Sequence, residues 1–277
     1  MNRARQYDGE VPGNLAGKRL DQALAEMFPA FSRTRLKSLI EQGQVRVNDR
    51  LPRPRDKVSG GEQVSLTALF EPVIEARAQP VPLVIVYEDE TLLVIDKPAG
   101  LVVHPGAGNP DCTLQNGLLH HAPALSALPR AGIVHRLDKD TSGLMVVAKS
   151  PAAHAGLVRA LEARDIHRGY EAVCTGVLTA GGQVNAPLGR HPVDRVRMAV
   201  RARGGRHAVT HYRVIRRYRA HTHLRLELET GRTHQIRVHL QHLGHPILGD
   251  EVYGKRGHFP RHMLHAWQLG FLHPRDG

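Results

Sequence analysis

A short charged run at residues 135–143 constrains the fold of this chain more than any other segment, because apolar stretches enclose it. Residues 131–134 and 144–148 are both typical of β-strands, so the charged run is expected where a connection between strands meets solvent. Loops anchored in this way often carry catalytic groups. Asp138 and Asp140 could equally stabilise a tight turn with no chemical role. By itself, the run leaves both interpretations open.

Two short amphipathic helices are predicted near the N-terminus. The apolar residues of the first recur at helical spacing: Leu20, Ala23, Leu24 and Met27. Those of the second follow Ser32, a residue that can cap a helix: Leu36, Leu39 and Ile40. Strand-like residues at 45–47 and 63–66 complete a compact module. Basic residues on the second helix and after it would suit RNA contact, or would simply solubilise the module: Arg33, Arg35, Lys37, Arg46 and Lys57.

The chain divides by composition into four parts. Residues 1–16 are polar and are expected to form a flexible N-terminal tail, whereas residues 17–68 form the small module. Residues 69–82 contain three prolines and are typical of a linker. The remaining residues, 83–277, are numerous enough for a larger domain with its own core.

The larger domain is predicted to be built mainly from strands. Four segments have strand character: residues 83–87, 91–96, 170–174 and 222–229. A helix is predicted at residues 157–163. Because strands and helices do not alternate regularly, we expect an α+β fold with a mixed, mainly antiparallel sheet and flanking helices.

Cysteine content and hydropathy predict where such a protein resides. Cys112 and Cys174 are the only cysteines among 277 residues, too few for a disulfide framework or a cysteine-based zinc site. No apolar run approaches the length that crosses a bilayer, and the N-terminus has no signal-peptide pattern. These features predict a cytoplasmic protein.

Positive charge is concentrated in one part of the sequence. The 38 basic and 26 acidic residues give a formal net charge of +12. Between residues 187 and 237, thirteen Arg, no Lys and three acidic residues give this stretch alone a charge of +10. Arginine suits phosphate because its planar guanidinium donates paired hydrogen bonds and stacks on bases. The composition therefore favours RNA as a partner, although an arginine-biased proteome could place the same residues on ordinary solvated faces.

Three ordered motifs carry a resemblance to a known family. The string HRLDKDTSGLMVVAK, from residue 135, resembles the signature of the RluA-type pseudouridine synthases. Residues 168–173 and 230–239, followed by 245–250, match further family segments in the same order. Residues 17–68 resemble an S4 RNA-binding domain. The resemblance implies an S4-like domain joined to a catalytic domain with a mixed, largely antiparallel sheet.

The same resemblance implies an activity and a set of site residues. The family isomerises uridine in RNA to pseudouridine, and the Asp of its RLD triplet, here Asp138, is the catalytic carboxylate. Arg237 matches the Arg that pairs with this Asp, and Tyr170 matches the Tyr that stacks on the target base. Arg136 matches an Arg that fills the gap left by base flipping. The implied substrate is 23S ribosomal RNA, in helix 69 or another uridine-bearing loop, alone or within an assembling large subunit.

Several alternatives are considered beside this interpretation. Asp138 and Asp140 could form the carboxylate pair of a glycosidase-like hydrolase, which would release free uracil. The His239, His242 and His245 side chains suggest a metal, but their spacing lacks a typical zinc pattern, so no metal and no cofactor are expected. A non-catalytic rRNA-binding or ribosome assembly factor is the main alternative. The chain is expected to be monomeric, and its C-terminal end looks incomplete beside the family.

Overall fold

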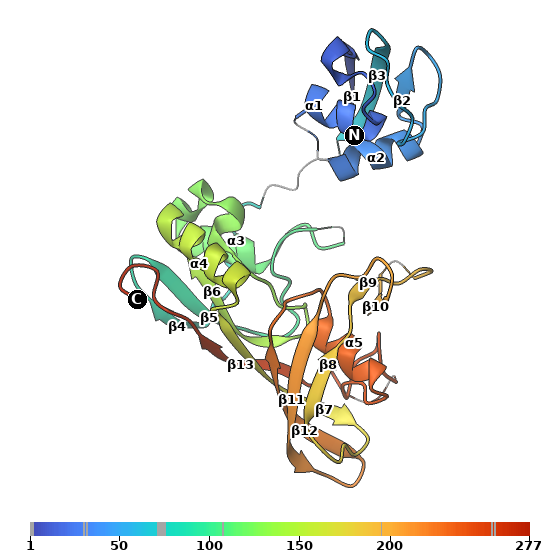
Figure 1. Cartoon of the computed structure of the whole chain (residues 1–277). Helices are drawn as coiled ribbons and strands as arrows, with labels where there is room; N and C mark the ends of the chain where they lie inside the picture. The colour runs from blue at the N-terminus through green and yellow to red at the C-terminus, as the bar shows by residue number, and fades with distance from the viewer. Residues whose placement is uncertain are drawn as a thin grey trace. The chain divides into compact units, whose positions relative to one another are not determined.

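The computed structural model describes residues 3–29, 31, 33–70, 76–106, 108–194, 196–255, 257 and 259–277. The chain forms two compact units, Met1–Val73 and Ile74–Gly277, which are described separately (Figure 1). None of the helices in the described ranges is long and apolar enough to span a bilayer.

The N-terminal unit packs two helices on a small antiparallel sheet. The helices are α1 (Leu20–Met27) and α2 (Arg33–Glu41), and a 3₁₀ turn, η1 (Gly13–Leu15), precedes them. The strands lie in the order β1 (Arg3–Glu10), β3 (Gln63–Phe70) and β2 (Val45–Val47). Both predicted helices and both predicted strands are confirmed, and the apolar residues that define the helices lie in one buried cluster. The capping role predicted for Ser32 falls outside the described residues.

The flexible tail predicted for residues 1–16 is wrong over its described part. Strand β1 pairs with β3 along its full length, from Arg3 opposite Phe70 to Glu10 opposite Gln63. Beyond β1, the side chains of Val11 and Leu15 are buried in the core of the unit. The polar composition of this segment misled the prediction, because a strand on an exposed sheet needs few apolar residues when its backbone is paired.

The larger unit is built on one mixed sheet of eight strands. Its strand order is β4 (Ile85–Glu88), β5 (Leu92–Lys97), β6 (Ser142–Ala148), β13 (Leu264–Gly270), β7 (His167–Thr175), β12 (His221–Leu228), β11 (Val209–Arg217) and β8 (Gly182–Asn185). Every neighbouring pair is antiparallel except β6 and β13, which are parallel. Strands β9 (Leu188–Arg190) and β10 (Met198–Val200) form a separate antiparallel pair. The predicted α+β class with a mainly antiparallel sheet is confirmed.

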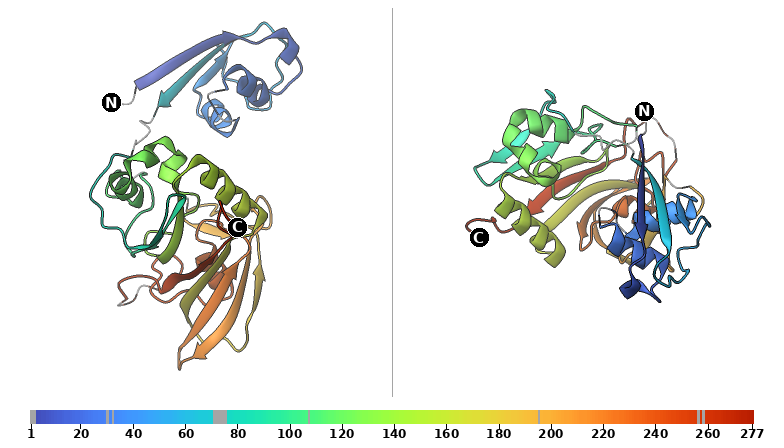
Figure 2. Two further views of the ribbon diagram at one scale, coloured as in Figure 1. Left: turned by 90° about the vertical axis from the view of Figure 1, so that its left-hand side faces the viewer. Right: turned by 90° about the horizontal axis from the view of Figure 1, so that it is seen from above.

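Helices cover the two faces of this sheet. Helices α3 (Leu114–His121) and α5 (Gln235–His242) bury their apolar residues in the main core, together with side chains from β5, β6, β7 and β12. Helix α4 (Pro151–Ala163) packs on the opposite face, against Leu92, Val146 and Ala148. Figures 1 and 2 show α3 and α4 toward the β4–β6 end of the sheet and α5 near β8.

One strand predicted in the larger unit is absent from the structure. Residues 131–134 do not form a strand: 3₁₀ turns η2 (Pro123–Ala127) and η3 (Pro129–Gly132) occupy this region, and Ile133 makes only an isolated bridge to Val147. Arg130, Ala131 and Gly132 all have positive φ, which a strand cannot accommodate. The apolar side chains here serve the core from a turn.

The boundaries predicted for the linker, 69–82, also need correction. Strand β3 continues to Phe70, and residues 71–75 lie outside the described residues. From Ala76 onward the segment belongs to the larger unit, because Asn116 Nδ2 donates to the Arg77 carbonyl and the Gln79 amide donates to the Asn116 carbonyl.

Gly143 marks the point where the charged run enters β6 beside β13. Its φ is +119°, and a Cβ at this position would collide with the backbone of Ala266, including its carbonyl oxygen. We expect Gly143→Ala to lower the free energy of unfolding by roughly 3 kcal/mol or more, measured by urea denaturation. Gly156→Ala, inside α4, meets only an ordinary contact at 3.5 Å and should leave stability unchanged or slightly higher. Equal losses for the two variants would contradict the steric argument.

Candidate active site

The charged run forms one wall of a cavity of about 550 Å³. Asp138 and Arg136 contribute from this loop, Tyr170 from β7, and Arg237 from α5, while residues 228–236 supply the facing wall. Leu137, between the two charged loop residues, is buried and anchors the loop in the core. The structure therefore brings together the three residues predicted as catalytic, Asp138, Tyr170 and Arg237, and places Arg136 on the same cavity.

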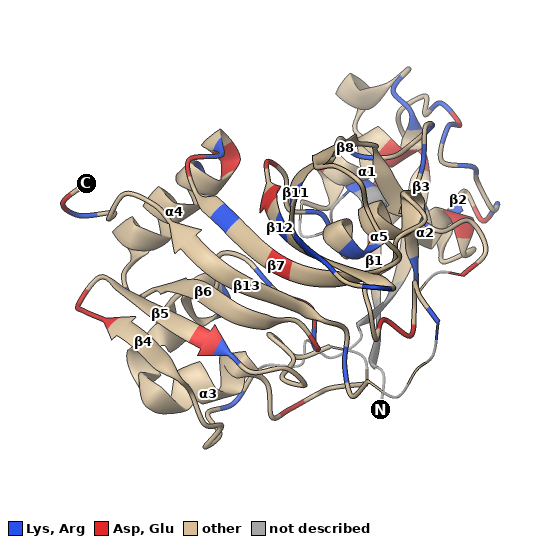
Figure 3. Cartoon of the chain, turned by 90° about the horizontal axis from the view of Figure 1, so that it is seen from below, with Lys and Arg blue, Asp and Glu red and all other residues tan. Residues whose placement is uncertain are grey.

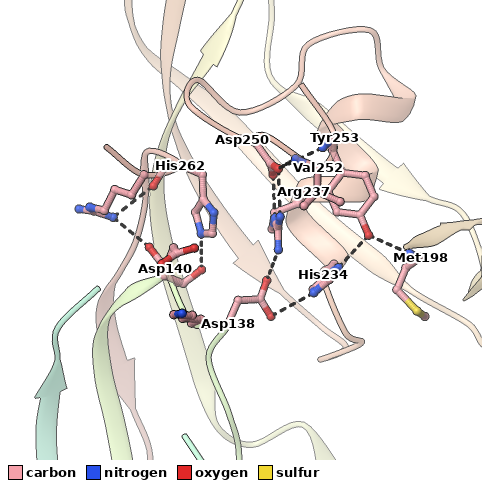
Figure 4. A network of polar contacts seen from close by, with 12 residues as sticks. Asp138, Asp140, Met198, His234, Arg237, Asp250, Val252, Tyr253 and His262 are labelled. Carbon is pink, nitrogen blue, oxygen red and sulfur yellow. Dashed lines mark hydrogen bonds and ion pairs between the residues drawn. The ribbon is translucent and has the colours of Figure 1, made fainter. Parts of the chain in front are cut away.

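Arg237 joins Asp138 to a second, deeper carboxylate (Figure 4). Arg237 Nη1 donates to Asp138 Oδ2 at 3.0 Å, while its Nε and Nη2 donate to the two oxygens of Asp250 at 2.7 and 2.9 Å. The Asp250 side chain has no exposed surface, whereas that of Asp138 is 17% exposed. The bidentate pair with Asp250 fixes the guanidinium plane, leaving one nitrogen directed at the carboxylate that faces the cavity.

The opposite charges of Arg237 and of the two carboxylates, Asp138 and Asp250, stabilise one another. Burial opposes the charge on Arg237, but the hydrogen bonds to Asp250 and the charge of Asp138 raise its pKa above the ordinary value. Burial likewise disfavours the charge on Asp250, and the Arg237 guanidinium nevertheless lowers the pKa of that carboxyl. The amides of Val252 and Tyr253 also donate to Asp250 Oδ1. A permanent cation is thus held beside Asp138 by groups that stay ionised at neutral pH.

His234 approaches Asp138 from the start of α5. Its φ of +56° lies in the left-handed region, and its Nε2 lies 3.9 Å from Asp138 Oδ1. Burial lowers the pKa of His234, so its ring is neutral at pH 7. The Met198 amide donates to the Tyr253 hydroxyl, whose own proton is then available to His234 Nδ1 at 2.7 Å. The Tyr253 hydroxyl thus holds the His234 ring from the side opposite Nε2, which faces Asp138.

Tyr170 lies in β7 with its ring buried in the wall of the cavity. Burial raises the pKa of Tyr170 to about 12. The charge of Arg168 lowers this pKa, and the charge of Asp138 raises it. Its phenol is therefore neutral at physiological pH, and what it offers a ligand is a flat aromatic surface rather than a phenolate.

One buried cation, Lys97, holds the backbone of the loop that carries Asp138. Lys97, which has no exposed surface, donates from Nζ to the carbonyls of Pro98, Leu101 and Lys139 at 2.8–2.9 Å. Burial lowers the pKa of Lys97 to about 8, against the raising effect of Asp140 and Asp138. The carbonyl that follows Asp138 in the chain is thus fixed by a side chain from a different strand.

Side chains that were not assigned to catalysis hold both ends of the loop. His135 Nε2 accepts a hydrogen bond from the Val146 amide at 3.1 Å. Thr141 Oγ1 lies 2.8 Å from Nε2 of the buried His262. These contacts fix the backbone of the loop at His135 and at Thr141. Asp140 is not among the residues that line the cavity, so the structure does not pair it with Asp138 there.

The buried His262 makes the stability of this region dependent on pH. Burial lowers the pKa of His262 to about 4, whereas an unfolded histidine binds a proton near pH 6.5. Between these values the unfolded chain holds more protons, so the free energy of unfolding falls as the pH drops from 7 to 4, by roughly 3 kcal/mol for this group. We expect His262→Gln to flatten the pH dependence of urea denaturation by about this amount. Parallel curves for the two proteins would contradict the assignment.

The basic residues predicted to bind RNA in the N-terminal unit have mixed surroundings. Arg33 is half exposed but is paired with the buried Asp21 at 2.9 Å, and Lys37 lies 3.7 Å from Glu41. Arg46 is exposed and donates to the Asp49 carbonyl, and the remaining two are exposed as well: Arg35 and Lys57. Arg33 therefore also compensates a buried acid of its own unit, and RNA contact by these five residues stays a prediction.

Two of the histidines considered as metal ligands, His239 and His245, contact other groups of the protein. Both ring nitrogens of His239 are engaged, with Thr210 Oγ1 at 2.8 Å and the Ala186 carbonyl at 3.0 Å. His245 Nδ1 lies 2.9 Å from the Thr175 carbonyl. Over the described ranges, no three His, Cys, Asp or Glu side chains are grouped as a metal site would require.

Comparisons with known proteins identify the family. The model of the RNA pseudouridylate synthase family matches residues 91–242, and the S4 domain model matches residues 18–64. The chain belongs to the RNA pseudouridylate synthase family. It is therefore an RNA pseudouridine synthase, an isomerase, with an N-terminal S4 domain, as the motifs predicted. The family match contains Asp138, Tyr170 and Arg237, so the whole cavity described above lies within or beside it.

Full-length relatives and solved structures agree with this assignment. The ribosomal large subunit pseudouridine synthase D of Salmonella typhimurium is 53% identical over 288 residues, which cover 98% of this chain and 88% of the relative. The protein of the same name from Xanthomonas campestris pv. campestris is 54% identical, covering 96% and 85%. The structure of human RNA pseudouridylate synthase domain containing 1 matches with a TM-score of 0.57 and 28% identity, over 72% of this chain and 80% of that one.

Three members of the polar network were not predicted from the sequence: His234, Asp250 and Tyr253. His234 and Asp250 lie inside segments that carried the resemblance, at residues 230–239 and 245–250, but nothing in their spacing indicated a contact with Asp138 or Arg237. The one available signal for Asp250 was its place in residues 245–250, a segment that carried the family resemblance.

Proposed function

We propose that this synthase converts uridines of large-subunit (23S) ribosomal RNA, in the loop of helix 69, to pseudouridine with Asp138 as the catalytic carboxylate. The observation that carries the proposal is the Asp138–Arg237–Asp250 array at the wall of a cavity of about 550 Å³. The names of the most similar relatives, ribosomal large subunit pseudouridine synthase D, supply the substrate class.

The reaction breaks the bond between N1 of uracil and C1′ of ribose, and forms a bond between C5 and the same carbon. The proton on C5 is lost and N1 gains one, so atoms and charge balance within the substrate and solvent without a cofactor. Asp138, kept ionised by Arg237, acts as nucleophile or as proton acceptor in the first step. Arg237 is a positioning residue in this scheme, because it reaches the reacting atoms through Asp138.

The uridine must leave its stack to reach Asp138, because C1′ and C5 are enclosed in a helical strand. The exposed Arg136, two residues before Asp138 and on the cavity wall, fills the space that the flipped base vacates. The neutral ring of Tyr170 stacks on the uracil. Exposed basic residues of the S4 domain, such as Arg35 and Lys57, contact the surrounding RNA.

We further propose that the protein works as a monomer in the cytoplasm, on ribosomal RNA alone or in an assembling large subunit. The arginines between residues 187 and 237 support an RNA partner, since several lie on β11 and β12 (Figure 3).

The test uses two RNA hairpins of equal length, one with the helix 69 sequence and one with its loop uridines moved to the stem. Chemical mapping should detect pseudouridine only in the first, and mass spectrometry should find the RNA mass unchanged. Tight binding to the helix 69 hairpin without conversion would favour the binding-only alternative, whereas release of uracil would indicate a hydrolase.

A further inference from the structure

Arg168 lies in the cavity wall without a partner for its charge. Among the residues that the structure describes, none forms a hydrogen bond or ion pair with its guanidinium, and its Nε is buried from solvent. Burial lowers the pKa of Arg168, and the nearby Tyr170 acts in the opposite direction. A buried charged donor without an acceptor is unfavourable, so a group of this kind in a binding cavity indicates an acceptor that the ligand supplies.

Strand geometry places Arg168 beside the proposed reaction centre. Arg168 and Tyr170 are two residues apart in β7, so their side chains emerge on the same face of the strand. Both line the cavity that contains Asp138. The charges of Arg168 and Asp138 both act on the Tyr170 hydroxyl, Arg168 lowering its pKa and Asp138 raising it. The free guanidinium is therefore within electrostatic range of the tyrosine proposed to stack on the uracil.

The surroundings of Arg168 have an excess of positive charge. Arg164 and Arg232 line the same cavity. Burial is the main cause that lowers the pKa of Arg232, and three neighbouring charges lower it further: Arg206, Arg164 and Arg168. Glu229 is already shared by Arg164, at 3.2 Å, and His211, at 2.6 Å. Arg232 donates from Nε to the His207 carbonyl, which carries no charge. Arg168 and Arg232 therefore retain uncompensated charge at this end of the cavity.

The backbone opposite Arg168 is shaped to admit its guanidinium. A Cβ built on Gly231 would lie 2.5 Å from Arg168 Nη1, with no backbone atom of another segment nearby. The absence of a side chain at residue 231 thus leaves the space in which the guanidinium lies. A methyl group there would displace the arginine head without changing the charge of the protein.

We propose that Arg168, with Arg232 beside it, binds the phosphodiester group adjoining the flipped uridine and so fixes the ribose against Asp138. This inference rests on the proposed function, since it names the group that the RNA places at this site. A phosphodiester fits because it brings one negative charge and two free oxygens, which a guanidinium binds through paired hydrogen bonds. Arg168 is a substrate-binding residue in this scheme, and the uracil itself is bound elsewhere in the cavity.

The experiment combines protein variants with RNA that lacks one charge. The helix 69 hairpin carries a neutral methylphosphonate either 5′ or 3′ of the target uridine, or none. Arg168→Ala, Gly231→Ala and the control Arg275→Ala are compared with wild type; the Arg275 side chain is 56% exposed, is paired with the exposed Asp276 and does not line the cavity. Single-turnover rates are measured in the active proteins, and RNA affinities are measured with Asp138→Asn added to each.

We expect Arg168→Ala to weaken RNA affinity or the single-turnover rate about 10- to 100-fold on natural RNA. One of the two methylphosphonates should cost wild type a similar factor and cost Arg168→Ala almost nothing more. Gly231→Ala should reproduce part of the loss with an unchanged net charge. Arg275→Ala should stay within about threefold of wild type, since a single exposed charge contributes little.

Equal losses from the neutral linkages in wild type and Arg168→Ala, at both positions, would overturn the proposal. If Arg168→Ala does not fold, by circular dichroism, the insensitivity of wild type to both methylphosphonates would overturn it as well. Absence of pseudouridine from natural RNA with wild type would refute the proposed function instead, and the affinities would still decide whether Arg168 binds a phosphate.

Discussion

Asp138→Asn is expected to abolish pseudouridine formation, with a rate at least roughly 10⁴-fold below wild type, while RNA affinity stays within a few-fold. The amide keeps the shape of the carboxylate and can still accept a hydrogen bond from Arg237 Nη1, but it can neither attack the substrate nor take up a proton. Single-turnover assays with tritium release from C5, alongside filter binding, separate the two effects.

Asp140→Asn is the matched control, because it makes the same chemical change two residues along the same loop. Asp140 is absent from the cavity lining, and its charge is felt mainly by Lys97. We expect its rate to remain within several-fold of wild type. Comparable losses for the two variants would support a pair of catalytic carboxylates, and full activity of Asp138→Asn would remove Asp138 from the chemistry.

Asp250→Asn is expected to lower both stability and activity, because it leaves Arg237 buried with half of its compensating charge. Removing one member of a buried ion pair costs about 3–5 kcal/mol, so the urea midpoint should fall sharply. The Arg237 guanidinium also loses the bidentate contact that orients it toward Asp138. We expect a rate reduction on the order of 100-fold at temperatures where the variant remains folded.

Two further variants separate the charge effect from general disruption. Asp276→Asn removes an acid whose side chain is 61% exposed and paired with Arg275, and it should change stability by no more than about 0.5 kcal/mol. The double variant Arg237→Met, Asp250→Leu replaces the buried pair with apolar groups and should regain much of the stability without activity. A stable but inactive Asp250→Asn would show instead that Arg237 tolerates the lost charge.

The sequence predicted elements whose pattern is local and missed those that depend on distant partners. Helix α1 was predicted because its buried apolar residues recur every three or four residues. Strand β1 was missed because its pairing partner, β3, lies some 60 residues later and its own composition is polar. Residues 131–134 were misread because a short apolar run does not reveal whether it packs from a strand or from a turn.

The residues of the site also divide into those that the sequence predicted and those that only the structure shows. The contact between Asp138 and Arg237, 99 residues apart, was implied by the family resemblance and not by any pattern within this chain. Asp250 and Lys97 could not be predicted as buried, since a charged residue carries no sequence signal that others will compensate it. Arg168 stood in a quoted motif, yet only the structure shows that its charge is unpaired.

The position of β13 in the sheet affects the order in which the enzyme can fold during its synthesis. This strand lies between β6, which follows the loop of Asp138, and β7, which carries Tyr170, yet it comes almost a hundred residues after β7 in the chain. A nascent chain that has emerged from the ribosome as far as α5 has both strands but no hydrogen-bonded link between them. The halves of the sheet can fold early, but they join only after Leu264–Gly270 is released. The complete sheet, and with it the arrangement of the reaction centre, therefore depends on a strand that is made after every residue of the Asp138–Tyr170–Arg237 group.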